Sequence, residues 1–197
     1  MNSLLGMLPS VLMMVAPILI AAMGGMIAER SGVTNIGLEG LMGFGAFGAA
    51  TSHALLEGIL PGSVWFALLM GLLAGALVSL IHAYAAISLK ADQTVSGTGI
   101  NLLAIGITVF LCQIIFKQER TEPYKLGMMP GPGGVYPTAY IAIVVLLASW
   151  YILYRRPVGL RLRACGEHPA AAASAGIDVK KYLYLAVLTS GALAGLA

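Results

Sequence analysis

The sequence alternates long apolar runs with short polar breaks. A helix that spans a membrane needs about 20 consecutive, mostly apolar residues. Five runs have that length: residues 8–28, 38–57, 63–88, 95–116 and 136–154. A sixth run begins near Tyr182 and continues to Ala197 without a polar tail. We therefore expect an all-α integral membrane protein: a polytopic bundle of transmembrane helices that forms one domain over residues 1–197, incomplete at its C-terminus.

The composition also favours a membrane protein. Hydrophobic residues make up 59% of the 197 residues, and charged residues only 10%. Soluble domains carry about 25% charged residues, so this chain has too few charges to cover its apolar surface in water. The first apolar run lacks a basic leader and a clear cleavage site, which favours a retained span over a signal peptide. Cys112 and Cys165 fall at opposite predicted membrane ends, so we expect free thiols.

Basic residues concentrate in one segment, residues 155–181, and their position predicts the orientation. The six are Arg155, Arg156, Arg161, Arg163, Lys180 and Lys181. Short loops rich in Lys and Arg remain in the cytoplasm, so we assign this segment there. Counting back through the spans places residues 29–40 and the turn at 90–92 on the same side. The turn at 57–61 and the loop at 117–135 are then external. The N-terminus is external too if residues 29–40 are a simple turn, and on the other side if they form a re-entrant segment. The loop at 117–135 could form a cap, contact a soluble partner or be a mobile connection.

A short surface helix is predicted inside the basic segment, over residues 169–175. Pro169 suits the first position of a helix and Gly176 the residue just past its end, and the alanines between them favour helix strongly. Asp178 can cap the next span. Small side chains allow close docking into a groove on another protein. The charges alone are equally consistent with a connector that contacts lipid headgroups.

Polar residues interrupt the apolar runs at two places near the same predicted membrane face. Their side chains could line a substrate pathway, because transporters often leave polar groups free where helices are broken. Each residue alone also suits helix capping or interhelical hydrogen bonding. Glu39 could be a first-turn carboxylate at the positive end of a helix dipole, or part of a polar path. The six predicted pathway residues are Asn35, Glu39, Gln93, Thr94, Ser96 and Asn101.

Other chemistry has weaker support in the sequence. His53 and His82 have no second ligand three or four residues away, so no metal site is predicted. Ser96 with either histidine as base would make an intramembrane serine hydrolase. However, Thr94 occupies the first glycine position of the Gly-x-Ser-x-Gly pattern that such enzymes often carry.

Small residues recur at helix-packing spacing in two runs. They stand four residues apart at Gly71, Gly75, Ser79 and Ala83, and again at Gly45 and Ala49. Such stripes let helices approach closely in lipid, so we expect these positions to form helix contacts.

Three stretches together resemble the membrane-spanning permease subunits of ABC importers, in the branch for nucleosides and simple sugars that is related to branched-chain amino acid permeases. They are "AERSGVTNIGLEGLMGFGAFGA", "VSGTGINLLAIGITVFL" and "GLRLRACGEHPAAAASAGIDVKKYLYLAVLTSGALAGLA". The resemblance implies that residues 155–181 dock onto an ATPase subunit. The residues that match the docking motif are Gly166, Glu167, Pro169, Ala171, Ala172 and Gly176. Family members continue through further spans after the last stretch, which favours a truncated chain.

The resemblance also implies the partners and the transported solute. Two ABC ATPase subunits, a second permease (a sister chain or a copy of this one) and an extracytoplasmic solute-binding protein would work with the chain in a bacterial-type cell membrane. No cofactor and no nucleic acid are expected. The chain has no Gly-x-x-x-x-Gly-Lys-Ser/Thr loop, so it would be a transport subunit and not an enzyme, with hydrolysis in a partner. The alternative is an ion-coupled secondary transporter with Glu39 as the coupling site.

Overall fold

The computed structural model describes residues 2–121, 127–131 and 134–197. Two pieces of the predicted external loop, residues 122–126 and 132–133, lie outside the described residues. The described part of the chain is helical and contains no strand. The helices in chain order are α1 (Asn2–Arg30), α2 (Leu38–Leu56), α3 (Ser63–Ala83), a π-helical turn η1 (Tyr84–Ser88), α4 (Gln93–Phe116), α5 (Pro137–Arg155), α6 (Pro157–Glu167), α7 (Pro169–Ser174) and α8 (Val179–Leu196).

The predicted apolar runs all form helices. Among the described residues, four segments are long and apolar enough to cross a membrane: Pro9–Arg30, Ser63–Ser88, Gln93–Phe116 and Pro137–Arg155. Helices α2 and α8 form where spans were predicted, but they are less apolar than these four segments. Both contain glycine and serine among their apolar residues, and α2 also contains a histidine and α8 two lysines. The all-α, polytopic membrane fold is therefore confirmed.

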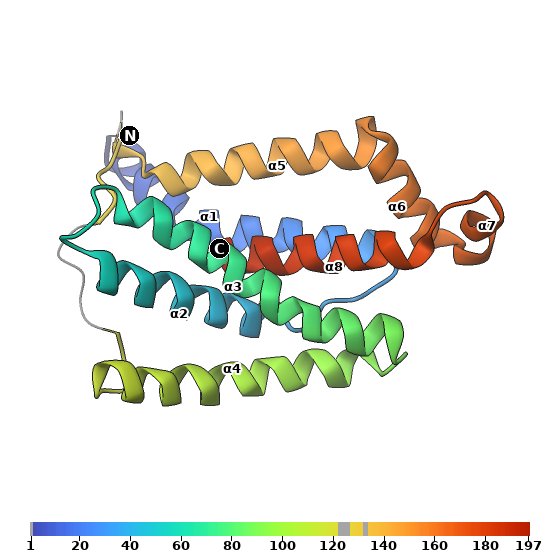
Figure 1. Cartoon of the computed structure of the whole chain (residues 1–197). Coiled ribbons are helices and arrows are strands. Elements are labelled where there is room, and N and C mark those ends of the chain that lie inside the picture. Colours follow the sequence, from blue (N-terminus) through green and yellow to red (C-terminus); the bar gives the residue numbers. More distant parts are fainter. Residues whose placement is uncertain (1, 122–126, 132–133) are drawn as a thin grey trace.

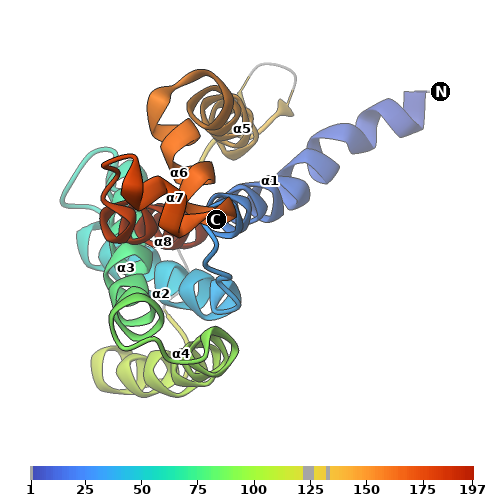
Figure 2. The same cartoon turned by 90° about the vertical axis from the view of Figure 1, so that its right-hand side faces the viewer.

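The two less apolar helices occupy the interior of the bundle. Helix α8 packs mainly against α3, α1 and α2, and α2 packs against α3, α4 and α8. Figure 2, which looks along the helices, shows α4 and α5 on opposite outer sides with α8 between them. A helix surrounded by other helices exposes little surface to lipid, so α2 and α8 do not need uniformly apolar side chains.

The ends of the helices sort into two sets, as the charge pattern predicted. In Figure 1, the N-terminus, the α2–α3 turn and the start of α5 lie at one end of the bundle. The η1–α4 turn, α6, α7 and the start of α8 lie at the other end. The chain leaves α1 at this second end and runs back toward the middle of the bundle before α2 begins (Figure 1).

Glycines form the crossing of α2, α3 and α8, which confirms the predicted packing role of the small residues. A Cβ added to Gly71 would lie 2.8 Å from the Gly195 carbonyl oxygen, and one added to Gly75 would lie 2.7 Å from the Gly195 Cα. A Cβ on Gly45 would overlap the Gly195 backbone. The three backbones therefore touch directly, which only residues without a side chain allow.

The basic segment contains two helices where one was predicted. The predicted surface helix forms as α7, and Gly176 follows it with a φ of +79°. The Asp178 side chain accepts a hydrogen bond from the Lys181 N–H (3.2 Å), which confirms it as the cap of α8. The preceding stretch forms α6, which begins at Pro157 and turns its buried residues, Gly159, Leu162 and Cys165, toward the bundle.

Candidate functional site

The segment between α1 and α2, residues 31–37, is not helical, and we call it the α1–α2 break. Side chains of α4 hold its backbone. The Gln93 Oε1 accepts a hydrogen bond from the Thr34 N–H (2.7 Å). Asn101 bridges the end of the break and the first turn of α2: its Oδ1 accepts from the Gly40 N–H (2.8 Å) and its Nδ2 donates to the Ile36 carbonyl (3.2 Å). Two predicted pathway residues thus satisfy backbone groups that the break leaves without helical partners.

Asn35 connects the break to α8. Its side chain is only 4% exposed, and its Nδ2 donates to the Ser190 Oγ at 3.0 Å. The Asn35 Oδ1 is also buried and has no hydrogen-bond partner among the described residues. Two residues earlier, Val33 packs into an apolar cluster that contains Ala83, Ile87 and Val187. The break is therefore held by contacts with α3, η1, α4 and α8.

The glycines of the break and of the first turn of α2 have two different roles. Gly32 has a φ of +89°, a conformation that side chains disfavour, and lets the chain turn out of α1. Gly37 and Gly40 instead allow contact with α4. A Cβ on Gly37 would lie 3.3 Å from the Gly97 carbonyl oxygen, and one on Gly40 would lie 2.8 Å from the Ile100 carbonyl oxygen. This second role was not predicted from the sequence.

The other three predicted pathway residues do not join the break directly. Glu39 is exposed in the first turn of α2. Thr94 is exposed in the first turn of α4, where its N–H donates to the Asp92 Oδ1 at 2.8 Å. Ser96 lies 3.0 Å from the His82 Nδ1. That last pair joins α4 to α3. No acidic group that would orient the imidazole is hydrogen-bonded to His82 in the described part of the chain, so the pair lacks the third member of a hydrolase triad.

The second candidate site is the basic loop, residues 155–181, which was predicted to be cytoplasmic and protrudes at one end of the bundle with α7 outermost (Figure 1). Pro169 is the first residue of α7, and Glu167 ends α6 with an exposed side chain. Ala171 is exposed, but Ala172 is only 4% exposed. The surface that α7 offers a partner therefore includes Ala171 and excludes Ala172, where a larger side chain would disturb the loop itself.

The two candidate sites touch each other through glycine. A Cβ added to Gly166 would lie 2.9 Å from the Ser31 carbonyl carbon and 3.0 Å from the Gly32 nitrogen, and would overlap the Arg30 carbonyl oxygen. The end of α6 thus rests directly on the first residues of the α1–α2 break. A displacement of residues 155–181 would therefore act on the break through direct backbone contact, with no side chain between them.

Cys165, beside that contact, is a free and buried cysteine. Burial, and secondarily the charge of Asp178, raise the pKa of its thiol above the ordinary value. The thiol therefore stays protonated at neutral pH, and its chemical character is that of a small apolar side chain. Within the described residues, no group of histidine, cysteine, aspartate and glutamate side chains could hold a metal ion.

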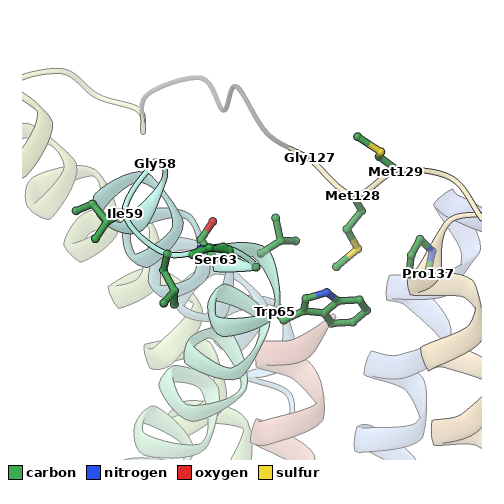
Figure 3. A pocket seen from close by; sticks show the side chains of 12 residues that line it. Gly58, Ile59, Ser63, Trp65, Gly127, Met128, Met129 and Pro137 are labelled. Carbon is green, nitrogen blue, oxygen red and sulfur yellow. The ribbon is translucent and has the colours of Figure 1, made fainter.

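A hollow of about 500 Å³ lies at the opposite end of the bundle, between the α2–α3 turn and residues 127–129. Figure 3 shows Trp65 and Met128 pointing toward each other across it, with Pro137 nearby on α5. Ile59 and Met129 expose 75% and 80% of their surfaces here. This end therefore presents an apolar, concave surface, in contrast to the basic loop at the other end.

Comparisons with known proteins show which family the chain resembles. A family model described as the permease component of branched-chain amino acid transport systems matches residues 7–197. The chain is 45% identical, over 95% of its length, to the guanosine ABC transporter permease protein NupQ of Bacillus subtilis. It is 37% identical over 98% to the nucleoside ABC transporter permease protein NupC of Lactococcus lactis. It is 33% identical over 98% to the putative glucose ABC transporter permease protein TsgC13 of Haloferax volcanii.

The chain spans 64%, 66% and 61% of the lengths of these three relatives, slightly less than two thirds of each. No solved structure matches the chain. The family model covers nearly the whole chain, including the α1–α2 break, the glycine crossing and the basic loop at residues 155–181. The chain therefore belongs to the family of permease components of branched-chain amino acid transport systems.

Proposed function

We propose that this chain is the membrane-spanning subunit of an ABC importer for a nucleoside or a similar small polar solute, in a bacterial-type cell membrane. The observation that carries the proposal is the 45% identity, over 95% of the chain, to a protein named as a guanosine permease. The relative at 37% identity is also named for nucleosides. The relative named for glucose keeps simple sugars as the second substrate class.

The cytoplasmic loop is the proposed docking surface for the ATPase. Helix α7 offers exposed alanines at the tip of the loop, and small side chains suit close docking. Gly166 then connects the loop to the α1–α2 break through direct backbone contact. When nucleotide binding closes the ATPase pair, the loop would move, and the break would carry that motion to α2, α4 and α8.

The pathway itself is proposed to run beside the break. Asn35, Gln93 and Asn101 provide polar side chains at the break. Two exposed polar residues stand next to it: Glu39, two residues after the break, and Thr94, which follows Gln93 on α4. A second permease chain would complete the path, and we favour a sister chain over a second copy. At the opposite end, the concave surface near Trp65 is available to an extracytoplasmic binding protein.

Co-purification of the full-length gene product with ATPases from neighbouring genes tests the proposal. The assembled complex is reconstituted in proteoliposomes, and ATP-driven uptake of radiolabelled guanosine, uridine and glucose is measured. Ala171→Arg should weaken ATPase binding at least tenfold, because a charged, bulky side chain then stands on the docking surface. Ala91→Arg is the matched control, since Ala91 is an exposed alanine outside the loop.

A protein that binds no ATPase but takes up solute along a pH gradient would overturn the proposal in favour of a secondary transporter. Glu39→Gln would then abolish uptake if Glu39 carries the coupling proton. ATP-driven uptake that is unaffected by Ala171→Arg would instead keep the importer and reject α7 as the docking helix.

A further inference from the structure

Three arginine–aromatic pairs gather where α5 meets α6, and we call these six residues the arginine–aromatic corner. In each pair a guanidinium group lies over a ring, in the geometry of a cation–π contact. The distances from the guanidinium carbon to the ring centroid are 5.6 Å for Arg155 over Trp150, 5.0 Å for Arg156 over Tyr151, and 5.0 Å for Arg163 over Tyr154.

The corner lies at the boundary between the bilayer and the cytoplasm. The membrane-crossing segment of α5 ends at Arg155, so its last turns hold the aromatic rings at the level of the lipid headgroups. All three rings remain exposed on the side of the molecule: Trp150 by 49%, Tyr151 by 45% and Tyr154 by 43%. Helix α6 continues from this point with exposed Leu160 on the same short helix as buried Leu162, as expected for a helix that lies in the interface.

The arginines of the corner form no ion pair with a carboxylate of the described residues. The sequence from Pro137 to Gly166 contains no aspartate or glutamate. The Arg163 Nε is buried and has no hydrogen-bond partner among the described residues. Three neighbouring cations repel one another, so an external anion stabilises this arrangement.

We propose that the arginine–aromatic corner binds the phosphate of an anionic lipid headgroup in the cytoplasmic leaflet. A guanidinium group offers a planar fork of donors that matches phosphate oxygens. The rings hold the guanidinium groups at the headgroup level, and the exposed ring edges face the acyl chains. A protein partner would need to reach into the membrane boundary to touch the same rings, so a lipid is the occupant that this position favours. The proposal does not depend on which solute is transported.

Binding of single lipids to the purified, delipidated full-length protein tests the inference. Native mass spectrometry compares phosphatidylglycerol with phosphatidylcholine of the same acyl chains. Each arginine near an anionic membrane surface contributes about 1 kcal/mol, or roughly a fivefold change in affinity. Arg156→Gln/Arg163→Gln should therefore weaken phosphatidylglycerol binding by about 25-fold and leave phosphatidylcholine binding unchanged.

Arg161→Gln is the matched control. Arg161 has the same charge on the same helix, but its Nη1 donates to the Tyr182 hydroxyl (3.1 Å) and it stacks on no α5 ring. The wild-type comparison needs no variant, so a double variant that failed to fold would not prevent the test. Equal binding of the two lipids by the wild-type protein would overturn the inference. So would a loss in Arg161→Gln as large as in the double variant, or displacement of phosphatidylglycerol by the ATPase.

Discussion

A single added methyl group on Gly166 should separate ATP hydrolysis from transport. A Cβ at this position would lie 2.9 Å from the Ser31 carbonyl carbon and 3.0 Å from the Gly32 nitrogen, and closer still to the Arg30 carbonyl oxygen. Ordinary contacts of a Cβ begin near 3.4 Å. Gly166→Ala must therefore move α6 and the α1–α2 break apart by at least about half an ångström. Overpacking of this size costs about 1–3 kcal/mol.

The consequence should differ between the two activities of the proposed transporter, ATP hydrolysis and solute uptake. The exposed surface of α7 lies outside this contact, so Gly166→Ala should still bind the ATPase and permit hydrolysis. The break, however, no longer follows α6 closely. Uptake of labelled nucleoside per ATP hydrolysed should then fall several-fold in proteoliposomes, while the thermal midpoint of the complex falls by a few degrees.

Gly159→Ala is the matched control for this prediction. Gly159 lies on the same helix, but a Cβ there would overlap the backbone of Ile152 and Leu153 on α5 instead of the break. It should lower stability at least as much as Gly166→Ala and leave the uptake-to-hydrolysis ratio unchanged. The reasoning would be refuted if Gly166→Ala kept the wild-type ratio, or if Gly159→Ala lowered the ratio equally.

Three further predictions concern Asn101, Gly75 and Cys165. Asn101→Leu removes the hydrogen-bond partner of the Gly40 N–H and should lower the free energy of unfolding by about 1–3 kcal/mol, measured as a lower thermal midpoint in detergent. An unchanged midpoint would contradict a stabilising role of this hydrogen bond. Gly75→Ala would overlap the Gly191 carbonyl oxygen and should destabilise by about 1–3 kcal/mol, whereas Gly106→Ala, with no neighbour within 4 Å of its Cβ, should be neutral. Because the pKa of Cys165 is raised, its maleimide labelling in the folded protein should increase only at a pH above the ordinary thiol value of about 8.5. Labelling of Cys165 in the unfolded protein near the ordinary thiol pKa of about 8.5 would confirm that burial raises its pKa in the folded protein.

Features encoded by neighbouring residues were predictable from the sequence. Helix boundaries followed the apolar runs, and Pro169 and Gly176 marked the ends of α7 correctly. Helix α6 was missed because its arginines resembled a solvated loop. A signal for it was present: Pro157 at its start, and buried Gly159 and Leu162 three residues apart on one face.

The partners of the polar residues were not predictable, because they lie far away in the sequence. Asn35 meets Ser190 across 155 positions, and Gly40 meets Asn101 across 61. The pattern indicated that these residues needed polar partners but could not tell a substrate from another helix. Ala172 shows the same limit: an alanine-rich helix has no apolar stripe, so nothing in the sequence distinguished its buried face from Ala171 on its exposed face.

The position of the α1–α2 break explains why its polar partners come from other helices. Non-helical backbone at membrane depth is tolerated only where its N–H and C=O groups are satisfied by protein or water. A break stabilised by its own residues would be insensitive to the rest of the bundle. This break depends on Gln93 and Asn101 of α4 and on Ser190 of α8, and it touches α6 at Gly166. Any movement of one of these helices against another must therefore strain or release the hydrogen bonds of the break, and this dependence supports the proposal that the break couples motion of residues 155–181 to the substrate path.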